Sequence, residues 1–162
     1  MGNGKKSVMV SACLLGINCR YDGHSKPVPN LTALLPDYEI IPFCPERLVN
    51  MAIPRPPAEI CNGDGTGVWN GTAKVFNQNG LDLSREFRLG AQRALEMFLK
   101  ERPELVIFKA NSPSCGVNRI YDGNFSGTLR EGDGVTVVLF RQAGANIMTE
   151  TEFLESPSVS LE

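Results

Sequence analysis

Residues 105–116 read Leu-Val-Ile-Phe-Lys-Ala-Asn-Ser-Pro-Ser-Cys-Gly, and this stretch decides the fold. Its first part, residues 105–108, is a continuous apolar run, which is typical of a strand buried on both faces of a parallel sheet. A polar loop that carries Cys115 follows at once. Residues 82–102 predict an amphipathic helix that ends before Pro103, with one apolar face made of Phe87, Ala91, Ala94, Leu95 and Phe98. A helix that leads directly into a buried strand indicates an α/β architecture.

Two further strands are predicted at residues 7–12 and 38–43, and each is followed directly by a cysteine, Cys13 and Cys44. Cys115 likewise lies a few residues after the strand at 105–108. The carboxyl ends of parallel strands lie at the same edge of a sheet, where ligands of such folds bind. The sequence therefore predicts that the three cysteines form one thiolate site.

The other predicted elements complete an alternating pattern, which indicates a single three-layer α/β domain with a mostly parallel sheet. They are a short helix at 31–35, a helix rather than a strand at 135–141, a strand at 146–148, a helical turn at 149–154, and an extended insertion at 59–80 with a hairpin at 77–80. We place the domain at residues 7–156, after a flexible N-terminus at 1–6. A disordered tail at 157–162 ends in Leu-Glu, which is compatible with a remnant of a cloning vector.

The composition is that of an ordinary soluble domain, with 162 residues, 42% hydrophobic residues and a formal net charge of −2. No half of the chain is strongly basic, so nucleic acid is not expected as a partner. No apolar run is long enough for a bilayer or a signal peptide, and we expect a cytoplasmic protein. Five cysteines in such a chain favour metal binding or catalysis over a disulfide framework, the alternative being buried, inert thiols.

Thiolates select zinc, copper(I) or iron–sulfur clusters. The chain has no Cys-x-x-Cys pair, which structural zinc sites commonly use, although Cys19 or His24 could complete a zinc site with the three cysteines. Three thiolates from separate loops suit a cubane cluster that leaves one iron open, free to bind a substrate as a Lewis acid.

Polar residues beside these cysteines are candidates for chemistry. Glu46 follows Cys44 by two residues and is a candidate general acid or base. Ser112 and Ser114 share the loop of Cys115, where a hydroxyl could bond a substrate or the sequence could simply form a turn. Gly116 would allow a ligand to approach the backbone closely.

Two charged positions are less specific. Asp22, with Arg20, lies in a glycine-punctuated loop after Cys13 and could contact a substrate or form a solvated ion pair. Arg55, in the stiff Pro-Arg-Pro-Pro segment at 54–57, could face an oxyanion in the pocket or belong to a mere connection.

Several motifs in order resemble the thiouracil desulfurase family, formerly a domain of unknown function. They are Ser-Ala-Cys-Leu-Leu-Gly at 11–16, Cys-Arg-Tyr-Asp-Gly at 19–23, Cys-Pro-Glu at 44–46, Pro-Arg at 54–55 and Ser-Pro-Ser-Cys-Gly at 112–116. The resemblance covers roughly residues 8–153. It implies a Rossmann-like fold and an oxygen-labile [4Fe-4S] cluster as the cofactor.

By this resemblance the cluster ligands are Cys13, Cys44 and Cys115, and the catalytic pair is Glu46 and Ser112. The implied reaction is non-redox removal of sulfur from a thiolated pyrimidine or a similar small thioamide. Sulfur passes to the open iron, and a water that Glu46 helps to deprotonate attacks the carbon. The final acceptor of the sulfur is not implied.

The chain departs from the family pattern at residues 47–53, where bulkier side chains replace the usual glycines and bear on the choice of substrate. Cys19 and Cys61 also lie outside the motif cysteines; Cys61 is interpreted as structural, and Cys19 as a thiol that could pair with Cys13 when the cluster is lost. Two alternatives stay open at this stage. One is a non-catalytic zinc module, and the other is a thiol redox or sulfur-carrier protein that uses the same cysteines.

Overall fold

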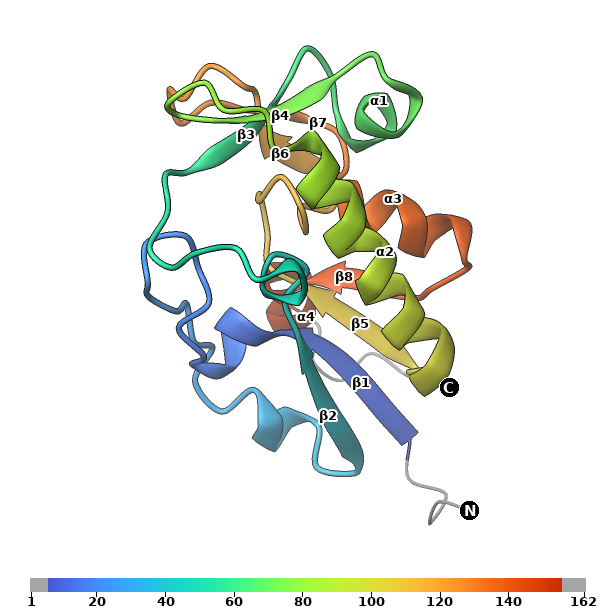
Figure 1. Cartoon of the computed structure of the whole chain (residues 1–162). Helices are drawn as coiled ribbons and strands as arrows, with labels where there is room; N and C mark the ends of the chain where they lie inside the picture. Colours follow the sequence, from blue (N-terminus) through green and yellow to red (C-terminus); the bar gives the residue numbers. More distant parts are fainter. Residues whose placement is uncertain (1–5, 156–162) are drawn as a thin grey trace.

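The computed structural model describes residues 6–155 (Figure 1). The predictions for residues 1–5 and for the tail at 157–162 lie outside these residues. Strand β1 begins at Lys6, which pairs with Tyr38, so it starts one residue before the strand predicted at 7–12. Among residues 6–155 we find no helix with the length and apolar character that a membrane span requires.

A four-stranded parallel sheet forms the centre of the molecule. It comprises β1 (Lys6–Ser11), β2 (Tyr38–Phe43), β5 (Leu105–Phe108) and β8 (Ile147–Thr149), in the order β2-β1-β5-β8. All of its neighbouring strands pair in parallel. The two inner strands, β1 and β5, are buried almost throughout, as the continuous apolar run of β5 predicts. The structure therefore confirms the α/β fold class.

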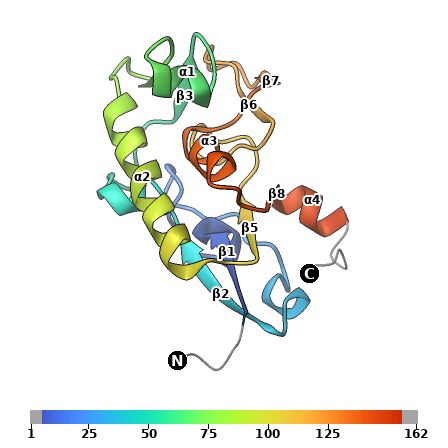
Figure 2. The same ribbon diagram turned by 90° about the vertical axis from the view of Figure 1, so that its right-hand side faces the viewer.

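Helices cover both faces of this sheet, so the domain has three layers (Figure 2). On one face lie α2 (Ser84–Glu101) and α3 (Val135–Gln142), and on the other lie α4 (Glu150–Glu155) and the 3₁₀ turns η1 (Ala12–Leu15) and η2 (Thr32–Leu34). The ring of Phe108 packs edge-on against Phe43 and Phe140, with centroids 5.5 and 5.2 Å apart. Val8, Val10, Leu14 and Phe153 fill the opposite core.

The predicted helices and the last strand are confirmed with small shifts at their ends. α2 begins at Ser84 instead of residue 82, and in the turn just before the helix the Ser84 amide donates to Asp82 Oδ1 at 2.9 Å. The favoured helix at 135–141 is α3, and the strand and helical turn near the end of the chain are β8 and α4. The helix expected at 31–35 is only the 3₁₀ turn η2.

The prediction that residues 59–80 form an extended insertion is wrong. The structure has β3 (Ala58–Cys61), α1 (Gly65–Asn70) and β4 (Lys74–Asn77) there, and β3 pairs with β4 in antiparallel fashion. The turn at 77–80 does form, since the Gly80 amide donates to the Asn77 carbonyl at 2.9 Å.

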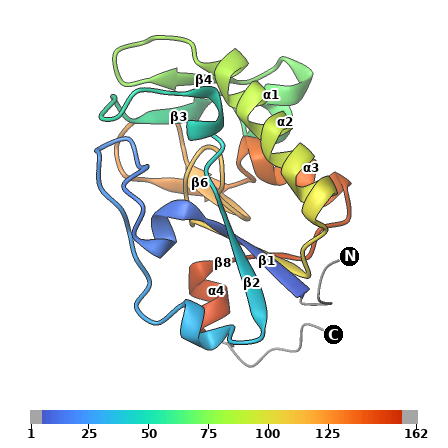
Figure 3. The ribbon, with the colours of Figure 1, turned by 60° about the horizontal axis from the view of Figure 1, so that its bottom comes forward.

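A second antiparallel pair, which the sequence did not reveal, comprises β6 (Arg119–Tyr121) and β7 (Leu129–Glu131). The pairs β3–β4 and β6–β7 lie beyond the carboxyl ends of the parallel strands, and α4 lies on the face of the sheet opposite α2 (Figure 3). The two antiparallel pairs therefore cover the edge of the sheet where the cysteines lie.

Candidate active site

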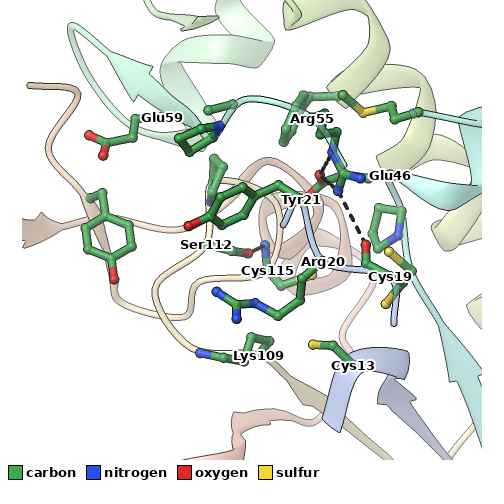
Figure 4. Close-up of a pocket in the computed structure, with 18 of the residues that line it drawn as sticks. Cys13, Cys19, Arg20, Tyr21, Glu46, Arg55, Glu59, Lys109, Ser112 and Cys115 are labelled. Carbon is green, nitrogen blue, oxygen red and sulfur yellow. Dashed lines mark hydrogen bonds and ion pairs between the residues drawn. The ribbon is translucent and has the colours of Figure 1, made fainter. Parts of the chain in front are cut away.

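The three cysteines that follow the parallel strands line one pocket, with a volume of about 360 Å³ (Figure 4). Cys13 lies in η1 after β1, Cys44 directly after β2, and Cys115 in the loop after β5. Cys13 and Cys115 are buried and Cys44 is half-buried, and none of them forms a disulfide. The topology of the sheet thus brings together the three thiols that the sequence places at strand ends.

A fourth thiol, Cys19, lies among them. Its thiol lies close enough to those of Cys13 and Cys44 for the three to influence one another's protonation. The hydrogen bond with Cys13, together with burial, raises the pKa of Cys19 to about 11. The hydrogen bond with Cys19 and burial likewise raise the pKa of Cys44, and burial raises that of Cys115 to about 12. In the metal-free protein these thiols are therefore protonated at neutral pH, and metal binding must release protons.

The chemistry of the donor set is compatible with a multi-iron cluster. Across the part of the chain that the structure describes, no three His, Cys, Asp or Glu side chains converge closely enough to hold one metal ion. His24, a possible fourth ligand of a zinc site, does not line the pocket. Thiols on three separate loops suit a cluster, in which cysteines hold different irons.

Glu46 lines the pocket and forms an ion pair with Arg55. The Arg55 Nε donates to Glu46 Oε1 at 3.0 Å, and its Nη2 donates to the same oxygen. Arg55 also donates from Nη1 to the Ala52 carbonyl at 3.0 Å and from Nη2 to that of Cys19 at 3.5 Å. Its side chain is only 9% exposed. Arg55 is thus engaged by a carboxylate of the protein, whereas the sequence left open whether it faces an oxyanion or belongs to a connection.

The segment that carries Glu46 is held from behind by α2. Gly90 of this helix packs against the backbone of Pro45, and a Cβ at position 90 would lie 3.0 Å from the Pro45 carbonyl carbon and closer still to its oxygen. Arg93 Nη1 donates to the Leu48 carbonyl at 2.6 Å. The helix therefore fixes the backbone between Cys44 and Glu46.

Ser112 lines the pocket and organises the loop of Cys115. Its Oγ accepts a hydrogen bond from the Cys115 amide at 2.7 Å, and its carbonyl accepts one from the Gly116 amide at 2.9 Å. The hydroxyl proton remains available to a ligand, because an oxygen that accepts one bond can still donate another.

Three other predicted site residues do not line the pocket. The Ser114 hydroxyl is buried and bonds Thr136 Oγ1 at 2.8 Å. Gly116 is packed so tightly that a Cβ there would lie 2.8 Å from the Ser112 carbonyl oxygen. Asp22 caps its own loop by accepting the His24 amide at 3.0 Å. These residues shape the loops of the site, and nothing in their contacts supports a role as substrate ligands.

Several residues that line the pocket were not predicted as site residues from the sequence. They are Tyr21 in the loop after η1, Glu59 on β3, Lys109 after β5, Tyr121 on β6 and Phe125 in the loop between β6 and β7. Lys109 follows a strand end directly, so its position carried the same signal as the cysteines. Glu59, Tyr121 and Phe125 carried no such signal, because their strands were not predicted.

The pocket has thiols, a carboxylate and a hydroxyl at the carboxyl edge of a parallel sheet, which is where enzymes of the α/β class bind their ligands. The family model described as 2-thiouracil desulfurase matches residues 8–152. The chain belongs to this family, whose members cleave a carbon–sulfur bond.

Two individual proteins are similar along almost their whole length. The uncharacterized protein YbbK of Bacillus subtilis (strain 168) is 41% identical over 145 residues, which cover 90% of this chain and 96% of that protein. A solved structure described as the [4Fe-4S]-dependent thiouracil desulfidase TudS has a TM-score of 0.79 and 38% identity, and the match covers 93% of this chain and 95% of that one.

Proposed function

We propose that this protein removes sulfur, with no net oxidation or reduction, from a thiolated pyrimidine such as 2-thiouracil or from a similarly small thioamide. We further propose that Cys13, Cys44 and Cys115 hold a [4Fe-4S] cluster. The observation that carries the proposal is the convergence of these three thiols on one pocket with Glu46 and Ser112. Family membership, and the similarity to a protein described as [4Fe-4S]-dependent, support it.

The proposed ligands reach the site from three separate strand ends, and no fourth ligand is assigned. When bound, such a cluster supplies an iron without a protein ligand, which acts as a Lewis acid toward a thiocarbonyl sulfur. Cys19, whose thiol contacts two of the ligands, is proposed as a neighbour of the cluster and not as a ligand.

Glu46 is proposed as the general base that takes a proton from the attacking water. Both bonds from Arg55 go to Oε1, so Oε2 is the oxygen left to receive that proton. Arg55 fixes the direction of the carboxylate, and a base must lie within hydrogen-bond reach of the proton it removes. Arg55 is thereby a positioning residue, because it acts through Glu46.

Ser112 is proposed to orient the substrate. Its oxygen accepts the Cys115 amide, so its O–H group is left to donate, for example to the exocyclic oxygen of a thiopyrimidine. The pocket, at about 360 Å³, lies in the range of small-molecule sites and has mixed apolar and polar walls, which suits a planar heterocycle.

The test begins with protein purified without oxygen, on which iron, sulfide and the visible spectrum are measured. We expect about four irons per chain. Single Cys→Ser variants at 13, 44 and 115 should each lower the iron content, whereas Cys61→Ser, whose thiol lies outside the pocket, should not. A colourless protein with one stoichiometric zinc would refute the proposal.

The catalytic roles are tested separately. Glu46→Gln and Ser112→Ala should retain the iron and the visible spectrum of the parent protein but lose at least a hundredfold of turnover on 2-thiouracil, the scale of general acid–base catalysis. Full activity in both variants would show that the assigned roles are wrong even if the cluster is present.

A second candidate function rests on the contact of the Cys19 thiol with Cys13 and Cys44, which is a suitable arrangement for thiol redox or sulfur-carrier chemistry. It predicts that iron-free protein forms an intramolecular disulfide when titrated with a low-molecular-weight disulfide. It further predicts that the oxidised and reduced forms interconvert and that the iron-free protein still transfers sulfur to an acceptor after each cycle. Protein that is active only when iron is bound would exclude this candidate.

A further inference from the structure

The loop between β6 and β7, residues 122–128, lines part of the pocket through Phe125 and Gly127. Glu59 of β3 and Phe125 of this loop both line the pocket. Figure 4 shows Glu59 on the side of the pocket opposite Cys19 and Glu46. The proposed reaction uses neither Glu59 nor Phe125, although Glu59 is a buried carboxylate and only 8% exposed.

The loop is anchored on β3 by several contacts. Glu59 Oε1 accepts hydrogen bonds from the Gly123 amide at 2.9 Å and from the Phe125 amide at 3.1 Å. The Cys61 thiol donates to the Gly123 carbonyl at 3.5 Å. Gly123 itself lies so close to β3 that a Cβ there would be 2.6 Å from the Ile60 carbonyl oxygen. The backbone of the loop is therefore held directly against the strand.

Phe125 has an unusual backbone conformation at this place. Its φ is +55°, in the left-handed region that an aromatic residue seldom adopts, because its Cβ crowds the neighbouring carbonyl. Such a conformation persists only where the surroundings enforce it, and such residues gather at ligand sites. The bond from the Phe125 amide to Glu59 helps to hold this backbone conformation.

We propose that Phe125 determines substrate size in this pocket and that Glu59 is the positioning residue that holds it. This inference rests on the proposed desulfuration. The Phe125 ring closes the far end, so that a compact thiopyrimidine fits and a ring with a bulky substituent is excluded. Glu59 acts through the loop backbone, because its Oε1 accepts the amides of both Gly123 and Phe125.

The test compares kcat/KM for 2-thiouracil with kcat/KM for 5-propyl- and 6-propyl-2-thiouracil, using anaerobically purified holoenzyme. Phe125→Ala should raise the ratio of substituted to unsubstituted substrate about tenfold for at least one analogue, within the range that apolar pocket walls achieve. Asn124→Ala, an exposed neighbour on the same loop that does not line the pocket, should leave the ratio unchanged. A ratio within twofold of the parent for both analogues in Phe125→Ala would overturn the proposal.

The role of Glu59 has its own readouts. Glu59→Ala should raise KM for 2-thiouracil several-fold while kcat and the visible spectrum stay within twofold of the parent, and Glu59→Gln, which keeps an acceptor oxygen, should restore most of the loss. In the Phe125→Ala background, Glu59→Ala should change selectivity no further, since the two residues act as one unit. An additional change there would mean that Glu59 contacts the substrate directly, and would overturn its role as a positioning residue.

Stability provides a readout that does not depend on turnover. Phe125→Gly should melt at a higher temperature than Phe125→Ala, because glycine adopts a positive φ without steric cost. Equal melting temperatures of the two variants would show that the surroundings do not hold residue 125 in the left-handed conformation, and would overturn the proposal that Glu59 fixes Phe125 in place. If the parent protein binds its cluster but does not turn over 2-thiouracil, the proposed function fails, whereas turnover with unchanged selectivity refutes only this inference.

Discussion

Gly90→Ala sets two physical effects against each other at the back of the site. Alanine in a helix interior is favoured over glycine by about 1 kcal/mol. At this position, however, the new Cβ would overlap the Pro45 carbonyl oxygen and lie 3.0 Å from the carbonyl carbon. The obstacle is backbone, which cannot rotate away as a flexible side chain can, and overpacking of this kind costs about 1–3 kcal/mol.

We expect the steric cost to exceed the gain in helix propensity, with a net loss of up to about 2 kcal/mol in the free energy of unfolding. For a chain of this size the melting temperature should fall by up to about 8 °C. Pro45 lies between Cys44 and Glu46, so the iron content and the turnover should fall as well, although Gly90 does not line the pocket.

Urea unfolding and iron analysis of Gly90→Ala, beside the parent protein, measure both effects. The matched control is Gln92→Ala, which changes an exposed position of the same helix and should alter stability by no more than about 0.5 kcal/mol. A Gly90→Ala protein that is more stable than its parent and fully loaded with iron would refute the close approach of α2 to Pro45.

Three other predictions concern the same site. In steady-state kinetics, Arg55→Ala should lower kcat at least tenfold while the iron content is retained. Arg55→Lys should restore little of the lost kcat, because lysine cannot make both bonds to Glu46. Burial raises the pKa of Cys115 from 9.0 to about 12. The protonated thiol therefore contributes to the stability of the iron-free fold fully below pH 9, and this contribution is lost as the pH rises toward 12. Urea unfolding at pH 8 and pH 11 should show a lower free energy of unfolding at pH 11, and Cys115→Ala should make the difference between the two pH values smaller. Ser114→Ala should destabilise the protein by about 1–3 kcal/mol, because it leaves the buried Thr136 hydroxyl without its partner, and the double variant Ser114→Ala/Thr136→Val should lose less than the two single changes together.

The parallel sheet and its flanking helices could be predicted because their signals are local. The apolar run of β5 and the period of α2 each depend on consecutive residues. The segment around α1 could not be predicted in the same way. This helix has six residues, including two glycines, and it is stabilised by distant contacts, such as the bond from Trp69 Nε1 to the Val135 carbonyl at 2.9 Å. Short helices depend on tertiary packing that no local pattern records.

The candidate site was predictable to the same extent as the sheet. Strand ends place Cys13, Cys44 and Cys115 at one edge, so topology alone locates the pocket. The pairing of Arg55 with Glu46 was not predictable, because both lie in irregular segments whose path the sequence does not define. For the same reason the sequence could not place Phe125, since its loop is positioned by the unpredicted strands β3 and β6.

The order of the strands also has a consequence for how the protein matures. In the sheet β5 pairs directly with β1, but along the chain it follows β2, the whole β3–β4 unit and α2. During synthesis the ribosome therefore releases Cys13 and Cys44 well before Cys115 exists. Any cofactor that needs all three thiols can be completed only after translation has passed β5. Until then the early cysteines are exposed to whatever oxidants and metal ions surround the nascent chain.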